Sequence, residues 1–256
     1  MKLSILLLLL LLWSLHFSQE LEKTNGIFEY EQIESRNKGF KSHIIFFNLN
    51  ITNLFSTYTQ IYTKELDEEY IEDNEGSVNE VIVVKPKKDE MKIVFNNFEN
   101  NLMYFKDIVA FDKIYVKEDK FKMEWKIVDE TRKYGKRICK KATTEFRGRT
   151  YTAWYLPEIS TEVGPWKFIN PPGLIYEIYD ADKILHIKLN KFNTKKQSKI
   201  NSWDNEKNKK IIDVKKYVKL KEKAEEIILE RLNSKLPKGS APFIKNTEQK
   251  EIEIFN

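Results

Sequence analysis

The feature that most constrains this chain is a series of short apolar segments with a period of two residues between residues 25 and 190. In segments such as 26–33, 44–51 and 121–128, aromatic and β-branched residues alternate with polar ones, as in half-buried strands. Turn-forming residues separate these segments, and no helical pattern lies between them. The sequence therefore predicts a mainly β fold, an antiparallel, meander-like curved sheet or half-barrel, and argues against a parallel βαβ architecture.

The pattern changes after Asn190. Residues 191–223 contain twelve lysines, and apolar residues recur at helical spacing from Val214 to Leu232. Asp213, directly before this stretch, is a typical N-cap residue. We therefore expect one C-terminal amphipathic helix that packs on the sheet, with a helix lying on a membrane or on a partner as the alternative.

The chain divides into three predicted parts. Residues 1–18 are expected to be a signal peptide and residues 19–190 an antiparallel β domain. Residues 191–256 are expected to form a lysine-rich linker, the helix and a tail that pack on the same domain. Within the tail, the apolar residues of 252–255 predict a short terminal strand.

The first eighteen residues have the composition of a secretory signal. Lys2 supplies a positive charge, an unbroken apolar run reaches Trp13, and polar residues up to Ser18 precede the predicted mature start at Gln19. The apolar run is about half of the roughly 20 residues that a membrane-spanning helix needs, so cleavage is expected. The single cysteine, Cys139, excludes an internal disulfide and also a lipid attached next to the signal.

Charge excludes one class of partner. A net charge of +5 is too small to indicate nucleic-acid binding. The lysine-rich segment 191–223 is expected to be a solvated face, with peripheral contact to anionic lipid headgroups as the alternative. The acidic segment 65–75 lacks the spacing of a calcium loop, so a solvated loop is expected there.

The most distinctive motifs lie between Tyr134 and Asp180. In chain order they are Cys139 in an apolar strand, Gly148-Arg149-Thr150-Tyr151-Thr152-Ala153-Trp154, Gly164-Pro165-Trp166-Lys167-Phe168 and Pro172-Gly173-Leu174-Ile175. Together they resemble the GLPGLI family of exported proteins from Bacteroidetes bacteria. Asn170 and Pro171 stand where the family signature has its first glycine and first leucine. The resemblance implies the periplasm or outer envelope of a Gram-negative cell, or secretion from it, and supplies no catalytic residues.

Two stiff turns stand out among these motifs. Pro172-Gly173, preceded by a second proline, restricts the backbone and then offers a residue free to adopt positive φ before the strand at 174–179. Gly164-Pro165 forms a similar turn before Trp166 and Phe168. Either these turns make tight corners in the sheet, or they present an apolar edge to a ligand or partner.

Two single residues have alternative interpretations. Basic neighbours could lower the pKa of the Cys139 thiol, although a cysteine on an apolar strand is more typical of a small core residue. Arg149 could clamp a carboxylate or phosphate, although an outward-facing charge is the more common role.

No pattern of catalytic residues is present. The two histidines after the signal, His43 and His186, are isolated, and no nucleophile elbow, zinc-ligand spacing or glycine-rich phosphate loop occurs. We therefore predict no metal, no cofactor, and binding rather than catalysis. A hydrolase would require one of the two histidines to meet a carboxylate and a hydroxyl in one cleft.

Two binding functions are therefore expected, and they differ in where the aromatic residues lie. A carrier for an apolar or peptide-like ligand would have a deep apolar cavity, lined by Phe46, Tyr104, Trp125 and Trp154. A module that docks to an envelope protein or outer-membrane assembly would have a filled core and exposed Trp166 and Phe168. The carrier is the favoured prediction.

Overall fold

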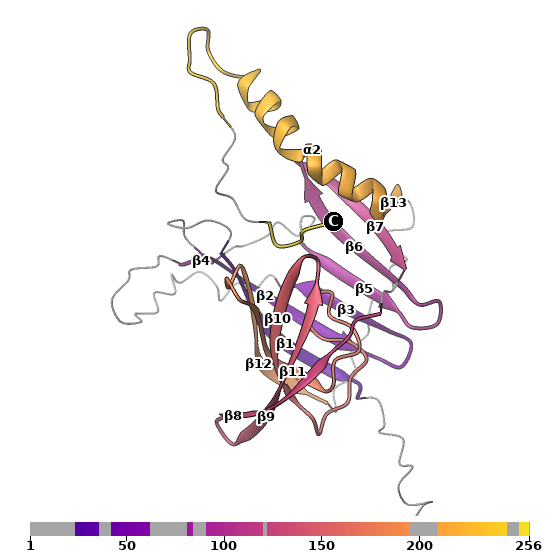
Figure 1. Cartoon of the computed structure of the whole chain (residues 1–256). Coiled ribbons are helices and arrows are strands. Elements are labelled where there is room, and N and C mark those ends of the chain that lie inside the picture. The colour runs from indigo at the N-terminus through magenta and orange to yellow at the C-terminus, as the bar shows by residue number, and fades with distance from the viewer. Residues whose placement is uncertain are drawn as a thin grey trace, which may run out of the picture.

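The computed structural model describes residues 24–35, 42–61, 81–83, 91–119, 122–194, 209–244 and 251–255, with backbone only for Ser42, His43 and 81–83. The predicted signal peptide, the acidic segment 65–75 and the lysines of 195–208 lie outside these residues. The described chain forms one sheet and one helix (Figure 1). The elements are β1 Gly26–Glu34, β2 Ser42–Ile51, β3 Phe55–Gln60, β4 Val81–Val83, β5 Ile93–Asn97, β6 Leu102–Val109, β7 Asp112–Asp119, β8 Lys126–Tyr134, β9 Arg137–Phe146, β10 Arg149–Leu156, β11 Leu174–Asp180, β12 Leu185–Asn193, β13 Ile211–Asp213 and α2 Val214–Asn233.

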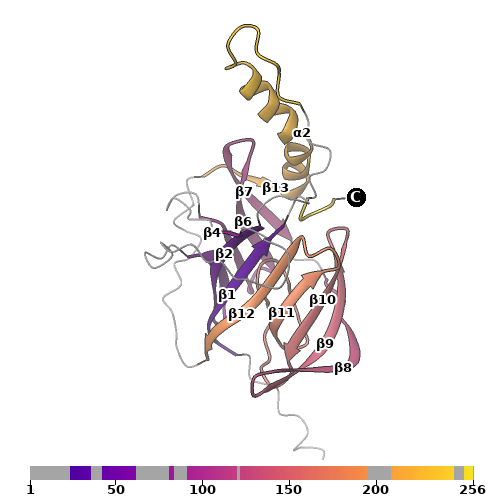
Figure 2. The same ribbon diagram turned by 90° about the vertical axis from the view of Figure 1, so that its left-hand side faces the viewer.

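The sheet is open and mostly antiparallel, as the sequence predicts. Its strand order is β13-β7-β6-β5-β3-β2-β1-β12-β11-β10-β9-β8, and β4 pairs with β2. Only β13 with β7 and β4 with β2 are parallel pairs among the described strands. The sheet bends so that its two halves face each other across the core (Figure 2). The hydroxyl of Tyr30 in β1 donates to the carbonyl oxygen of Ile175 in β11 at 2.8 Å across this core.

The core lies on the inner face of the bend. One row of inward side chains crosses four neighbouring strands, with register partners Ala142, Ala153, Ile178 and Ile187, all buried. Because successive side chains in a strand point to opposite faces, their neighbours in sequence point outward. A smaller cluster around Phe95 lies on the outer face of β5 to β7.

Two predicted strands differ from the structure: one begins later than predicted, and the other does not form. Residues 122–125 form no strand, and β8 begins at Lys126 and continues to Tyr134. Trp125 packs inward instead, where its indole N–H donates to the carbonyl oxygen of Ile169 at 3.0 Å. Residues 251–255 are also not a strand, because their contacts are mainly with side chains rather than with a neighbouring strand.

The predicted helix is confirmed as α2. Asp213 is its N-cap, and the carboxylate accepts from the backbone N–H of Lys216 at 2.9 Å. Tyr217, the only buried residue of the helix, packs edge-on against Phe105 of β6 with ring centroids 5.1 Å apart. The described residues contain no helix that is long and apolar enough to cross a membrane. Contacts with β6, β7 and β13 hold α2 at one end of the sheet.

Candidate binding cleft

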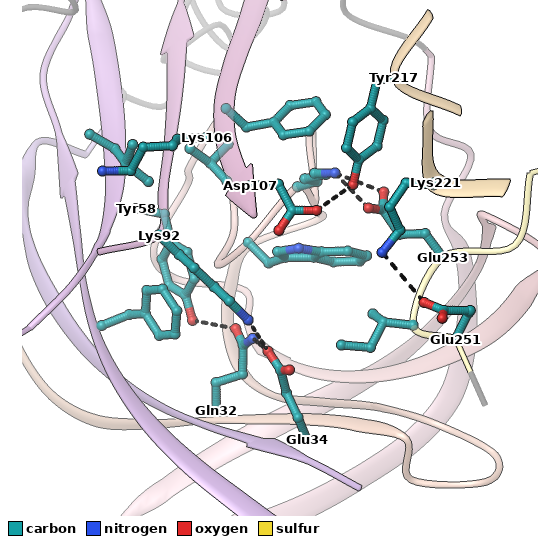
Figure 3. A pocket seen from close by; sticks show the side chains of 17 residues that line it. Gln32, Glu34, Tyr58, Lys92, Lys106, Asp107, Tyr217, Lys221, Glu251 and Glu253 are labelled. Atoms are coloured by element: carbon teal, nitrogen blue, oxygen red, sulfur yellow. Dashed lines mark hydrogen bonds and ion pairs between the residues drawn. The ribbon is translucent and has the colours of Figure 1, made fainter. Parts of the chain in front are cut away.

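A polar cleft lies where the bent sheet, α2 and residues 251–255 meet (Figure 3). Its volume is about 70 Å³, enough for several water molecules or one polar group of a ligand. The lining residues come from eight separate parts of the chain: Gln32, Glu34, Phe47, Tyr58, Lys92, Ile93, Val94, Phe105, Lys106, Asp107, Trp166, Lys167, Tyr217, Lys221, Glu251, Ile252 and Glu253.

The cleft has a polar lining because the inward-facing residues of two strands, β1 and β6, change from aromatic to polar along the strand. In β1 the inward positions are Phe28 and Tyr30, followed by Gln32 and Glu34, and all four are buried. In β6 the inward face continues from Phe105 to Asp107 at the same spacing. Alternation therefore places amide and carboxylate groups inside, at one end of the core.

The first hydrogen-bonded network lines one wall. Tyr58 donates to the amide oxygen of Gln32 at 3.1 Å, and the amide nitrogen of Gln32 donates to Glu34 at 2.8 Å. Lys92 forms an ion pair with the same Glu34 oxygen at 2.8 Å. Burial raises the pKa of Tyr58 well above its ordinary value, and Tyr30 and Glu34 add to the effect. Tyr58 therefore stays a neutral donor.

The second network lines the wall beneath α2. Tyr217 donates to the Asp107 carboxylate at 2.6 Å. Burial alone would raise the pKa of Asp107, but the positive charge of Lys221 and the Tyr217 hydrogen bond outweigh it, so the pKa lies below its ordinary value. Asp107 is therefore ionised at neutral pH inside the cleft.

The Gly164-Pro165 turn positions two more lining residues. The N–H of Gly164 donates to the carbonyl oxygen of Phe168 at 2.8 Å, which closes a tight loop. Trp166, at the tip, has φ of 54°, an unusual conformation for a bulky residue that is common at functional sites. Lys167 is buried, and its ammonium lies 3.7 Å from the ring centroid of Phe105.

The stiff turns thus form a tight corner, and only part of the predicted apolar edge is presented. Trp166 is half-buried and lines the cleft, whereas Phe168 is completely buried and not exposed. The strand that follows the second turn begins with Leu174 and Ile175, which are also completely buried. Pro172 is partly buried beside them and does not line the cleft.

Gly173 has a different role from the one predicted. Its φ is not positive; instead, a Cβ there would collide with the carbonyl oxygen of Leu156 and approach the Tyr155 ring to 2.9 Å. A Cβ at Gly164 would lie 2.6 Å from the terminal methyl of Ile175, which would have to shift.

The structure assigns Cys139, Arg149 and Trp154 to places outside the cleft lining. Cys139 is completely buried, and burial raises the pKa of its thiol to about 11, so the thiol is not activated. Trp154 lies beneath Arg132, whose guanidinium carbon is 4.1 Å from the indole centroid. Arg149 is not simply outward-facing: it donates to the carbonyl oxygens of Glu251 and Ile252 beside the cleft.

One histidine meets a carboxylate, although not in the cleft. His186 Nε2 lies 2.9 Å from Glu177, which also accepts from the hydroxyl of Tyr134 and pairs with Arg132 at 3.5 Å. The His186 hydrogen bond lowers the pKa of Glu177 to about 2, and the Tyr134 hydrogen bond and the positive charge of Arg132 add to the effect. The side chain of His43 lies outside the described part of the chain. In the described residues, no three His, Cys, Asp or Glu side chains are placed to hold a metal ion.

The predicted carrier cavity is absent from the described residues in the form expected. Tyr104 packs with Phe95 and Tyr115 in the outer cluster, while Trp125 packs on Phe168 in the core with ring centroids 6.2 Å apart. These aromatic residues therefore do not share one apolar cavity.

One sequence signal marks three of the residues that line the cleft. Gln32, Glu34 and Asp107 occupy positions where the strand alternation requires a buried side chain. Polar residues in the apolar phase of a strand are expensive to bury, so they indicate a site. Lys167 and Glu253 carry no such signal, because neither belongs to a strand.

No family model and no curated protein matches this sequence. Two solved structures of PNGF-II, in different crystal forms, are similar to it with 15% identity and TM-scores of 0.47 and 0.48. They cover 78% and 79% of this chain, but the chain spans only about a third of their length, 33% and 34%. At this level the likeness assigns no function.

Proposed function

We propose that this protein is an exported, non-catalytic binding module of the bacterial cell envelope, and that its cleft accepts a polar, peptide-like ligand. The observation that carries the proposal is a set of polar groups at inward strand positions, the buried Gln32 and Glu34 and the partly buried Asp107. Burying such groups destabilises a fold relative to apolar residues, so their presence around a cleft favours a ligand.

The chemistry of the lining favours a ligand with both polar and apolar parts. Lysines and carboxylates alternate around the cleft, and Trp166 offers an aromatic surface beside them. Peptides have amide donors and acceptors together with charged and apolar side chains, so they match such a lining. A purely lipid-like ligand does not match it.

Export and location rest on the sequence alone. The signal-like residues 1–18 and the GLPGLI-like motifs support the periplasm or outer envelope, and the lysines of 191–223 support peripheral contact with anionic lipid. An intact mass measured on protein from the envelope should correspond to a chain that begins near Gln19. A chain that retains its first eighteen residues would contradict export with cleavage.

The decisive experiment is purification from the native envelope followed by native mass spectrometry of the bound molecules. We expect a small peptide-like ligand that is lost, or bound about tenfold more weakly, in Trp166→Phe. Trp125→Phe is the matched control, because Trp125 is half-buried near the same core but does not line the cleft. Recovery of no ligand under mild extraction, or equal loss in both variants, would contradict the proposal.

A further inference from the structure

Residues 251–253 line one wall of the cleft, and Ile254 and Phe255 pack beside it. The side chain of Arg149 donates to the carbonyl oxygens of Glu251 and Ile252, from Nε at 3.1 and 3.2 Å. The N–H of Ile254 donates to the carbonyl oxygen of Arg147 at 3.0 Å. These bonds engage only the main chain of 251–255, so any extended segment could make them.

The carboxylate of Glu253 occupies a specific site. Lys167 Nζ lies 2.8 Å from both carboxylate oxygens, and Arg147 Nε lies 3.5 Å from one of them. The side chains of Lys167 and Glu253 are only 4% and 11% exposed. A buried ammonium without its anion is strongly destabilising, so whatever replaces Glu253 must itself carry an anionic group to Lys167.

The flanking contacts are apolar. Ile252 is buried, and Phe255 packs edge-on against Tyr217 with ring centroids 6.1 Å apart. Ile254 lies over Gly148, where a Cβ would come within 2.7 Å of the Ile254 Cβ. The Arg147-Gly148-Arg149 turn therefore combines two guanidinium groups with a position that has no side chain, which lets a peptide lie directly on the backbone.

Together these contacts describe a peptide site that the protein's own chain fills. We propose that residues 251–255 are an internal ligand of the cleft, and that they compete with an extended peptide that has a carboxylate side chain between apolar ones. This inference rests on the proposed function and specifies its ligand class and its regulation, since the cleft opens to other ligands only when Glu253 leaves Lys167.

The test uses the full chain and two synthetic probes. The first probe is an acetylated peptide with the sequence of residues 251–255, EIEIF, and the second has glutamine in place of its central glutamate. In Glu253→Gln the internal carboxylate no longer competes for Lys167. We therefore expect that variant to bind EIEIF at least about tenfold more tightly than the wild type, and EIQIF at least about tenfold more weakly than EIEIF.

The charge-matched control is Glu230→Gln, an exposed residue of α2 that should bind both peptides as the wild type does. A second measurement needs no variant: excess EIEIF should accelerate hydrogen exchange at the Ile254 amide of the wild type, and EIQIF should not. Equal binding of the two peptides to Glu253→Gln, or unchanged Ile254 exchange, overturns the inference.

The proposed function has a separate outcome. A ligand that depends on Trp166 could be recovered from the envelope while neither peptide binding nor Ile254 exchange changes as expected. In that case the cleft binds a ligand, but residues 251–255 do not compete with it. If both peptide measurements give the expected results and no envelope ligand is recovered, the peptide site is supported and the proposed envelope ligand is contradicted.

Discussion

At the scale of single residues, contacts of a few atoms decide the packing at the turn before β11. Gly173 lies against the end of β10, where the Leu156 carbonyl oxygen leaves no room for a Cβ. That oxygen belongs to the backbone of a paired strand and cannot move aside cheaply. The turn therefore requires glycine for its small size.

Gly173→Ala should lower the free energy of unfolding by about 2–3 kcal/mol, since overpacking against backbone forces the strand to shift. Urea denaturation measures the change. Gly135→Ala is the control: Gly135 has φ of 58° but nothing within 4 Å of a Cβ, so only the backbone cost of about 1 kcal/mol is expected. Equal effects at the two positions would show that space is not the cause.

The carboxylate of Glu177 predicts a pH dependence. Its pKa in the folded protein, about 2, lies below the ordinary value of 4.5. The ionised form therefore stabilises the fold above the ordinary pKa, and this contribution is lost as the pH falls from about 5 towards 2.

Glu177→Gln should be less stable than the wild type at pH 7, and the difference should shrink between pH 5 and pH 2. Denaturation in urea at several pH values measures it. Glu130→Gln removes a half-exposed partner of Lys141 and should change stability by less than about 1 kcal/mol throughout. A difference that stays constant down to pH 2 would contradict the role of Glu177.

At the scale of elements, α2 matters because it carries Tyr217 and Lys221 to the cleft. Only its first turns pack on the core. Further along, Arg231 donates to the carbonyl oxygen of Ala110 at 2.7 Å and pairs with Asp112, both at the β6–β7 turn. The start of the helix therefore sets the geometry of the cleft wall.

Asp213→Ala should destabilise the protein by about 1 kcal/mol, because the N–H of Lys216 loses its acceptor at the helix start. Asp213→Asn keeps a capping oxygen and should cost at most a few tenths of that amount. Thermal or urea denaturation compares the two. If both variants lose equal stability, the charge of Asp213 matters rather than its capping bond.

At the scale of the whole molecule, the bend of the sheet is held by bonds between its two halves. Arg147, in the β9–β10 turn, pairs with Glu118 of β7. The Tyr30 hydroxyl joins β1 to β11, which are separated by β12 in the sheet. Both contacts join parts of the sheet that are not adjacent in the strand order.

Tyr30→Phe should lower the free energy of unfolding by about 1–2 kcal/mol, because the buried carbonyl of Ile175 loses its donor. The control is Tyr155→Phe, a buried tyrosine whose hydroxyl has no hydrogen-bond partner in the described chain. Equal stability of Tyr30→Phe and the wild type would mean that this bond does not hold the two halves together.

Local pattern was sufficient for most of the strands and for α2 with its Asp213 cap. It was insufficient where the outcome depended on neighbours distant in the chain. The pattern of 121–128 is that of a strand, yet Trp125 packs in the core because Ile169 offers its carbonyl oxygen. The local pattern also does not decide whether Phe168 is exposed beside Trp166 or packed in a tight corner. In the fold Phe168 is buried and Trp166 lines the cleft, with their ring centroids 5.4 Å apart.

What the sequence by itself determined was the β class of the fold and the single C-terminal helix, because alternation and helical spacing are properties of adjacent residues. Only the tertiary structure decided the cleft. Its essential pairs join residues far apart in sequence, as Lys167 with Glu253 and Tyr217 with Asp107. Such pairs form where the two halves of the bent sheet meet α2 and residues 251–255. A local sequence pattern does not predict how the sheet bends.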